Sequence, residues 1–200
     1  MIRPDASQTA VLRCGRCGRV SAWSDARLQV ECGCRTRVDL APPLVRDATP
    51  ADRELAEEIF RREFGGRQLV ADGQPVTPDR AELLVAETEG GVAGALAWRR
   101  LPEALHVIAL ATDPMWQRAG VGSSLLAEAE LLARRLSLTR VVITISNDNI
   151  PAQYFYQRRG YRLMKVLPGV IAAQPRNAGL AGFAAIPIVD EIQLSKDLPA

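Results

Sequence analysis

The sequence is short of several residue types, and each shortage narrows the range of functions. It has one histidine, at position 106, and only two lysines, Lys165 and Lys196, so almost all of its positive charge is arginine. No apolar run reaches the roughly 20 residues that a membrane-spanning helix needs. The net charge of +2 gives no reason to expect a nucleic acid or an anionic membrane as partner.

The first ten residues lack an apolar stretch followed by a small-residue cleavage site, so we expect no secretory signal and a cytoplasmic location. The length of 200 residues fits one medium domain and a small module, and 48% hydrophobic residues are enough for a buried core. We expect a module over residues 1–40, a stiff Ala-Pro-Pro linker over 41–43, and a second domain over 44–200.

No cysteine follows position 34, and this clustering favours a metal site over disulfide bridges, which a secreted protein would spread over its fold. Four thiolates suit tetrahedral zinc, which would hold together a module too small for a core of its own. The pattern resembles a zinc ribbon, although the second pair is CxC where CxxC is usual. Free or redox-active thiols and a rubredoxin-like iron site are the alternatives. The expected ligands are Cys14, Cys17, Cys32 and Cys34.

Short strand-like pieces surround these cysteines, at residues 11–13, 20–23, 27–30 and 37–40. Residues 1–40 hold seven arginines against four acidic residues, and a zinc site with four thiolates would offset about two of those charges. The remaining charge is a weak argument for nucleic acid. A structural or protein-docking role is therefore favoured for the module.

The rest of the chain alternates strand and helix signals, which predicts a mixed α/β (α+β) domain. Thr49 and Pro50 open a helix that Gly65 ends, and Leu55, Ile59 and Phe60 supply its apolar face. Asn149 opens another helix that runs to Arg159. Residues 67–81 and 168–187 lack a periodic pattern and are expected to be loops. The expected strands are residues 44–46, 83–87, 92–98, 105–112, 141–145, 161–166 and 188–194.

The sharpest motif is Thr112-x4-Gln117-x2-Gly120-x-Gly122, between an expected strand and a long expected helix. Backbone N–H groups at the glycines can wrap a pyrophosphate, and the helix N-terminus adds partial positive charge. The P-loop pattern GxxxxGK[ST] is absent, and Leu125 replaces the third glycine of the dinucleotide pattern GxGxxG. The alternative is a tight turn between a strand and a helix.

A second motif follows, Asn149-x2-Ala152-x2-Phe155-Tyr156-x3-Gly160-Tyr161. Together the two motifs resemble the GCN5-related N-acetyltransferase (GNAT) superfamily, over about residues 44–198. The resemblance implies a central mixed sheet flanked by helices, with acetyl-CoA as co-substrate. It specifies the cofactor well and the acceptor poorly, and homodimers are common in that family.

The resemblance also assigns roles to residues. The backbone of Leu110, Ala111 and Thr112 would pair with the pantetheine arm, where this strand and residues 141–145 splay apart. Asn149 would contact the pantetheine or set its helix, and Tyr156 would protonate the leaving thiolate. The CoA pyrophosphate would be held by the loop residues Gln117, Arg118, Ala119, Gly120, Val121 and Gly122.

The general base is the least determined role. His106 lies eleven residues before Gln117, on the strand that should line the cleft, and shares its face with Leu110. It could equally be a strand residue without a catalytic role, just as Tyr156 could simply pack against Phe155. Glu87, Asp190, Glu191 and a chain of water molecules are rivals for the base.

The sequence is compatible with three functions. The first is an N-acetyltransferase that moves the acetyl group to a primary amine of a small molecule or peptide by direct attack. The second is a non-catalytic acetyl-CoA sensor whose ribbon docks a protein or nucleic acid, although a sensor has no need of a proton donor such as Tyr156. The third is a nucleic-acid-modifying enzyme, which would need a basic face that the charge count does not supply.

Overall fold

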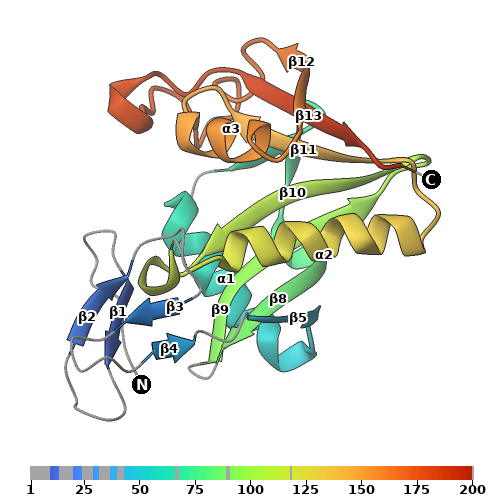
Figure 1. The fold of residues 1–200 in the computed structure, drawn as a ribbon. Coiled ribbons are helices and arrows are strands. Elements are labelled where there is room, and N and C mark those ends of the chain that lie inside the picture. The colour runs from blue at the N-terminus through green and yellow to red at the C-terminus, as the bar shows by residue number, and fades with distance from the viewer. Residues whose placement is uncertain are drawn as a thin grey trace. The chain divides into compact units, whose positions relative to one another are not determined.

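The computed structural model describes residues 10–13, 20–23, 29–31, 37–39, 43–65, 68–88, 91–117 and 119–199. The helices are α1 Pro50–Phe64, α2 Val121–Arg135 and α3 Ile150–Gln157, with short 3-10 turns at Pro78–Arg80, Pro114–Trp116 and Phe183–Ala185 (Figure 1). The strands are β1 Ala10–Arg13, β2 Val20–Trp23, β3 Gln29–Glu31, β4 Arg37–Asp39, β5 Leu44–Asp47, β6 Leu69–Ala71, β7 Gln74–Val76, β8 Glu82–Thr88, β9 Gly91–Arg100, β10 Ala104–Thr112, β11 Arg140–Ser146, β12 Arg162–Leu167 and β13 Glu191–Asp197.

Seven of the strands form one mixed sheet, in the order β12-β13-β11-β10-β9-β8-β5. β10 and β11 run parallel, and the connection between them contains α2. β13 enters between β11 and β12 and is antiparallel to both. This sheet with its three helices confirms the mixed sheet flanked by helices that the sequence predicted.

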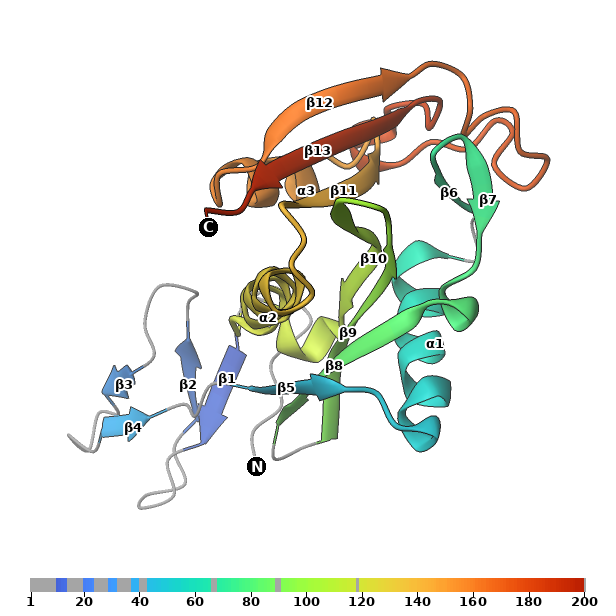
Figure 2. The same cartoon turned by 90° about the vertical axis from the view of Figure 1, so that its right-hand side faces the viewer.

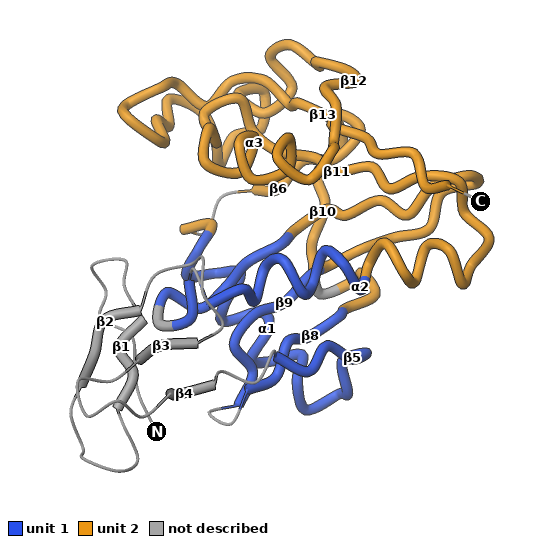
Figure 3. Tube along the Cα trace, viewed as in Figure 1, with its two compact units in different colours: residues 1–63, 84–96, 110–128 blue, residues 64–83, 97–109, 129–200 orange. Residues whose placement is uncertain are grey.

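The chain divides into two compact units (Figure 3). Unit 1 comprises residues 1–63, 84–96 and 110–128, and unit 2 comprises residues 64–83, 97–109 and 129–200. None of the helices in the described part of the chain has the length and apolar character of a membrane span.

In unit 1, the start of α1 is held by a buried carboxylate. Asp52 accepts hydrogen bonds from the backbone N–H and the hydroxyl of Thr49, both at 2.7 Å, and pairs with Arg46 of β5 at 2.6 Å. The positively charged Arg46 and the hydroxyl of Thr49 hold the pKa of Asp52 well below its ordinary value. Because these contacts join β5 to the first turn of α1, they set where the helix begins.

In unit 2, α3 lies beside β11 and β13 (Figures 1 and 2). Lys196 of β13 pairs with Glu130 of α2 at 2.8 Å, and the hydroxyl of Tyr161 donates to the same carboxylate at 3.1 Å. Tyr161 is 2% exposed and follows Gly160, whose φ of +87° ends the helical turn. The end of α3 is thereby fixed against the sheet.

Three expectations from the sequence need correction. Residues 67–81 are not a loop throughout, because β6 and β7 form an antiparallel hairpin there. The last strand begins at Glu191 rather than at Ile188, which packs instead with Val70 and Ile171 in a small separate cluster. Leu55 does not belong to the buried face of α1, since it is 52% exposed.

The N-terminal strands pair as β1 with β2 and β3 with β4, both antiparallel. They fall close to the strand-like pieces expected from the sequence. The four cysteines predicted to bind zinc lie outside the described residues. The predicted boundaries at 40 and 44 stay predictions.

Candidate active site

In unit 1, a strand, a turn and a helix start follow one another over residues 110–124. β10 ends with Leu110, Ala111 and Thr112, and the next N–H, of Asp113, donates to the Ala93 carbonyl at 2.9 Å. Leu110 and Thr112 are half-buried and Ala111 is buried. The predicted pantetheine-binding backbone thus forms the end of a sheet strand.

The glycine motif forms the turn into α2. Gly120 has a φ of +81°, a conformation that glycine adopts at little cost. The N–H of Ser124 donates to the Gly120 carbonyl at 2.9 Å, so the N–H groups of Val121 and Gly122 precede the first turn of helical hydrogen bonds. With the positive end of the helix behind them, these amides can bind an anion.

Two other residues of this motif already form hydrogen bonds within the protein. Gln117 is exposed, and its side chain donates to Glu63 at 3.3 Å. The N–H of Ala119 already donates to the Trp116 carbonyl at 3.2 Å. Arg118 lies outside the described residues. The geometry therefore favours the amides nearest the helix, at Val121 and Gly122, as donors to a phosphate.

Gly94 of β9 allows α2 to start close to the sheet. A Cβ atom at this position would lie 2.7 Å from Val121 Cγ1 and 2.9 Å from the Ala111 carbonyl oxygen. Both distances are shorter than a van der Waals contact. A glycine is thus required for β9, β10 and the first turn of α2 to approach this closely.

In unit 2, Tyr156 lies on α3 and is 4% exposed. Its ring makes edge contacts with Phe155, at 5.1 Å between centroids, and with Tyr161, at 5.9 Å. Burial raises the pKa of Tyr156 well above its ordinary value, and Arg159 opposes this only in part. The phenol therefore stays protonated at neutral pH, as a proton donor must.

Asn149 has a structural role at the start of α3. Its side-chain oxygen accepts the N–H of Ala152 at 3.1 Å, which caps the helix. Of the two roles that the sequence left open for Asn149, setting the helix is thus present in the structure. A contact with pantetheine stays a prediction.

His106 is fully buried on β10. Nδ1 lies 3.3 Å from Nε of Arg99, and Nε2 lies 2.7 Å from the Thr144 hydroxyl. Because arginine only donates, Nδ1 accepts and Nε2 carries the proton that it donates to Thr144. Burial lowers the pKa of His106 to about 4, with Arg99 adding to the shift and Asp72 and Glu191 opposing it. His106 is therefore neutral at pH 7.

A buried carboxylate, Glu191, completes this polar cluster. It accepts the N–H groups of Asp72 and Gly73, both at 2.9 Å, and Nε2 of Gln193 at 2.8 Å. The Thr144 hydroxyl lies 3.5 Å from the same carboxylate. Glu191 thus ties the β6–β7 turn to the sheet and ends a chain of hydrogen bonds that starts at Arg99.

The pairing of β10 with β11 covers only part of the two strands. The register runs from Ala104 opposite Arg140 to Val107 opposite Ile143, whereas β11 continues to Ser146. Within unit 2, Ile108 and Ala109 of β10 therefore lie beyond the last registered pair. The family resemblance implied that this strand splays apart from residues 141–145, but residues 141–143 are still paired, so only the part of β11 after Ile143 agrees with that expectation.

The rival candidates for the base are held in other interactions. Glu87 pairs with Arg46 at 2.9 Å in unit 1, and Asp190 accepts the N–H of Gly169 at 2.8 Å in unit 2. Glu191 accepts the donors already described. His106 is the candidate whose cluster contains both a hydroxyl and a second carboxylate, Asp72, at 3.5 Å from Nδ1.

Sequence reasoning missed Asp72, Arg99, Thr144 and Gln193 as members of this cluster. One available signal was the alternation in β13, where Glu191, Gln193 and Ser195 place polar residues on one face of a strand that is paired on both sides. Within the described residues, no group of three or more His, Cys, Asp or Glu side chains is arranged to hold a metal ion.

Comparisons with known proteins show the family of this chain. The model of the acetyltransferase (GNAT) family matches residues 47–161, more than half of the chain. The uncharacterized protein YxbD of Bacillus subtilis (strain 168) is 27% identical over 150 residues, which cover 73% of this chain and 93% of YxbD.

Two solved structures share the fold. Ard1 from Thermoplasma volcanium superposes with a TM-score of 0.62 at 18% identity and covers 80% of this chain and 100% of its own. A GNAT family acetyltransferase from Elizabethkingia anophelis, solved with acetyl-CoA bound, superposes with a TM-score of 0.58 at 20% identity, covering 78% and 97%. The chain belongs to the acetyltransferase (GNAT) family and is an acetyl-CoA-dependent acyltransferase.

Proposed function

We propose that this enzyme transfers the acetyl group of acetyl-CoA to a primary amine of a small molecule or peptide, by direct attack of the amine on the thioester. The observation that carries the proposal is the end of the β10–β11 register at Val107 and Ile143. Strands that stop pairing leave backbone N–H and C=O groups without a partner in that ladder, and pantetheine amides can pair with such groups.

The proposed roles act on different parts of acetyl-CoA. The amides of Val121 and Gly122 would bind the pyrophosphate, and the backbone of Leu110–Thr112 would pair with the pantetheine. The neutral amine attacks the acetyl carbonyl, so that a C–N bond forms and the C–S bond breaks. Backbone N–H groups of β10 would stabilise the oxyanion, and Tyr156 would protonate the departing thiolate.

His106 is our candidate to take the proton that the amine loses. Its resting state is neutral, but the N–H groups of Arg99 occupy the lone pair of Nδ1. Arg99 also forms an ion pair with Asp72, whose carboxylate lies 3.5 Å from Nδ1. A rotation of Arg99 away from Nδ1 that keeps its ion pair with Asp72 would free Nδ1 to accept the proton. Arg99 would then act as a positioning residue.

The test of this function is Tyr156→Phe, which removes one hydroxyl and keeps the aromatic contacts with Phe155 and Tyr161. We expect turnover with an amine panel to fall by about 100-fold, while acetyl-CoA affinity changes little, because the hydroxyl acts only on the leaving group. Equal loss of turnover and affinity would contradict the proton-donor role. Binding of acetyl-CoA by wild type without turnover on any amine would instead favour the sensor.

We also propose that Cys14, Cys17, Cys32 and Cys34 bind one structural zinc ion in a ribbon that docks a protein partner. The spacing of the cysteines and the two antiparallel strand pairs around them support this proposal. Metal analysis of protein purified without chelator should find one zinc per chain. Protein that is folded and free of metal would refute the ribbon.

A further inference from the structure

Thr144 of β11 lies between the only histidine of the sequence and a buried carboxylate, and all three residues belong to unit 2. Its hydroxyl oxygen is 2.7 Å from Nε2 of His106 and 3.5 Å from Oε1 of Glu191. Thr144 is also the first residue of β11 beyond the end of the β10–β11 register. Because His106 and Glu191 are fully buried, water does not compete for these contacts.

The direction of the two hydrogen bonds follows from the atoms that can donate. A carboxylate only accepts, so Glu191 takes the single proton of the Thr144 hydroxyl. The Thr144 oxygen is then left to accept, and Nε2 of His106 must donate to it. Glu191 is itself held by the N–H groups of Asp72 and Gly73, at 2.9 Å each. These contacts keep the proton of the neutral imidazole on Nε2 and the lone pair on Nδ1.

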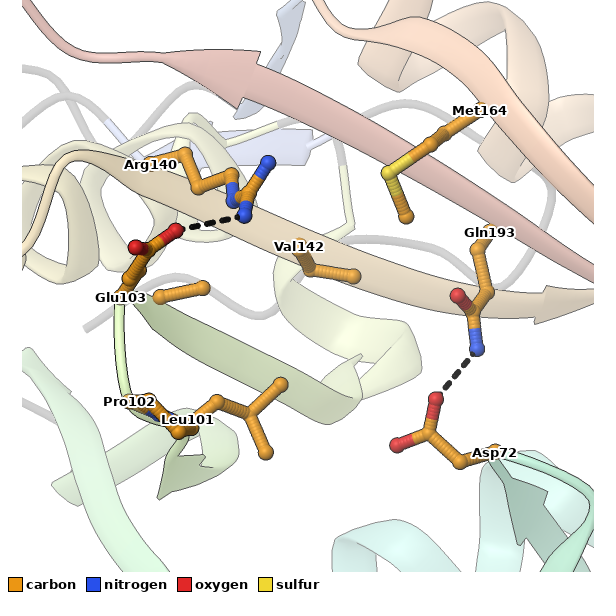
Figure 4. A pocket seen from close by; sticks show the side chains of 9 residues that line it. Asp72, Leu101, Pro102, Glu103, Arg140, Val142, Met164 and Gln193 are labelled. Atoms are coloured by element: carbon orange, nitrogen blue, oxygen red, sulfur yellow. Dashed lines mark hydrogen bonds and ion pairs between the residues drawn. The ribbon is translucent and has the colours of Figure 1, made fainter.

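The two ring nitrogens of His106 have surroundings of different accessibility. Asp72, which is 3.5 Å from Nδ1, has a side chain that is 44% exposed. It lines a pocket of about 390 Å³ together with Gln193 (Figure 4). The Nε2 side ends at Thr144 and the buried Glu191. A proton can therefore reach the ring from the Nδ1 side, and His106 can act as a base there only when the lone pair is on Nδ1.

Asp72 favours the opposite tautomer of His106. In the resting structure Arg99 donates to Nδ1 and pairs with Asp72, so both groups are occupied. Once Arg99 rotates away from Nδ1, the carboxylate of Asp72 would accept a proton from Nδ1, and the lone pair on that side would be lost. Gln193 donates to Asp72 (Figure 4) and to Glu191, both at 2.8 Å, and so holds the two competing carboxylates in place.

We propose that Thr144 is a positioning residue, which Glu191 orients and which keeps the proton of His106 on Nε2. It does so at the step when Arg99 no longer occupies Nδ1. The inference rests on the proposed function, in which His106 is the base. An N–H bond of the amine breaks as the Nδ1–H bond forms, and the resulting imidazolium still donates to the Thr144 oxygen through Nε2. The negative charges of Asp72 and Glu191 both favour this cation.

The test determines which nitrogen of His106 carries the proton, by NMR of the full chain with isotope-labelled histidine, without acetyl-CoA and at a pH well above the pKa of the ring. Arg99→Ala stands for the displaced arginine, because alanine neither donates nor accepts. We expect Arg99→Ala and Arg99→Ala/Thr144→Ser to keep the Nε2–H form in about tenfold excess, because serine retains the hydroxyl. In Arg99→Ala/Thr144→Val, which loses the hydroxyl at nearly constant volume, the Nδ1–H form should predominate.

Thr139→Val is the matched control, because Thr139 also lies in unit 2 and donates its hydroxyl to the Glu103 carbonyl at 3.1 Å, outside the cluster. Combined with Arg99→Ala, it should leave the Nε2–H form in excess. An Nδ1–H form that already predominates in Arg99→Ala would overturn the proposal. So would an Nε2–H form that persists in Arg99→Ala/Thr144→Val.

Turnover with the amine panel separates this role from a merely structural one, and it decides the question if the double variant does not fold. Thr144→Val alone should lower kcat by about tenfold or more at an unchanged KM for acetyl-CoA, and Thr144→Ser should recover most of the loss. A kcat in Thr144→Val equal to that of Thr139→Val would overturn the positioning role. The expected tautomer pattern in a protein that acetylates no amine would retain the hold of Thr144 on Nε2 and overturn the proposed function.

Discussion

Gly94 offers a sharp test of how the glycine motif is positioned, through the variant Gly94→Ala. The added Cβ would lie 2.7 Å from Val121 Cγ1, 2.9 Å from the Ala111 oxygen and 3.3 Å from Leu125 Cδ1. Val121 is 1% exposed and thus surrounded by other protein atoms, and the Ala111 oxygen belongs to the backbone of β10. The start of α2 must therefore shift away from the sheet.

Overpacking of this kind costs about 1–3 kcal/mol, and the backbone contact places Gly94→Ala toward the upper end of that range. A cost of about 2–3 kcal/mol would lower Tm by roughly 5–10 °C in a chain of this size. We expect urea unfolding to show the loss of stability. We also expect acetyl-CoA affinity, measured by calorimetry, to fall by about tenfold, since the first turn of α2 would move.

The double variant Gly94→Ala/Val121→Ala is the matched control, because it removes the 2.7 Å contact and leaves the contact with the Ala111 oxygen. It should recover part of the stability lost in Gly94→Ala, after correction for Val121→Ala alone. If Gly94→Ala unfolds at the wild-type urea concentration and binds acetyl-CoA equally well, the proposed close approach of β9 and α2 is wrong.

Three further predictions concern the titratable side chains of His106 and Asp52. His106 is the only histidine in the sequence, so proton NMR reports its pKa without ambiguity. We expect a pKa of about 4 in wild type and a higher pKa in Arg99→Gln. Equal pKa values in the two proteins would show that Arg99 does not act on Nδ1. Because unfolded His106 takes up its proton near pH 6.5 and folded His106 only near pH 4, stability is retained above pH 6.5. It falls by about 3 kcal/mol as the pH drops to 4, and His106→Gln should lose this part of the slope of unfolding free energy against pH. Asp52→Asn should lower the free energy of unfolding by about 1–3 kcal/mol at pH 7, as measured by urea titration, because it removes the charged acceptor that Arg46 and Thr49 share, although Arg46 keeps its ion pair with Glu87. The pKa of Asp52 is depressed by folding, so that loss should shrink as the pH falls below about 4, and a loss independent of pH would contradict the ion pair.

Local signals predicted most of the fold. The Thr49-Pro50 start of α1 and the Asn149-Ile150-Pro151 start of α3 appear in the structure where the sequence placed them. Each of these signals acts within a few residues of chain, through a cap or through the fixed φ of proline. The long strands of the main sheet were also predictable from local sequence, because each is a continuous run of apolar residues.

The β6–β7 hairpin was missed although Asp72-Gly73, with positive φ at both residues, is a common hairpin turn. Its flanking strands have three residues each, too short for a visible alternation. They are held by contacts distant in sequence, between Val70 and Ile171 and between the turn amides and Glu191. No local pattern carries such contacts.

The His106 cluster could be predicted only in part. From the sequence, His106 was predicted as the base by its spacing from Gln117, and Glu191 was an alternative candidate for the same role. No local pattern indicated that the two belong to one hydrogen-bonded chain through Thr144, because the three residues come from three strands. The orientation of Gln193 toward the pocket likewise depends on Asp72 and Glu191 together.

Calorimetric titration with acetyl-CoA, of the purified chain and of the variant Gly120→Val, tests whether the amides at the start of α2 bind the pyrophosphate. A valine at a φ of +81° is strained and would displace the turn, although its Cβ would have no other atom within 4 Å. We expect one-to-one binding at about micromolar affinity in wild type and a loss of about tenfold or more in the variant. Folded wild-type protein that does not bind acetyl-CoA, or a folded variant that binds it equally well, would show that these amides do not hold the pyrophosphate.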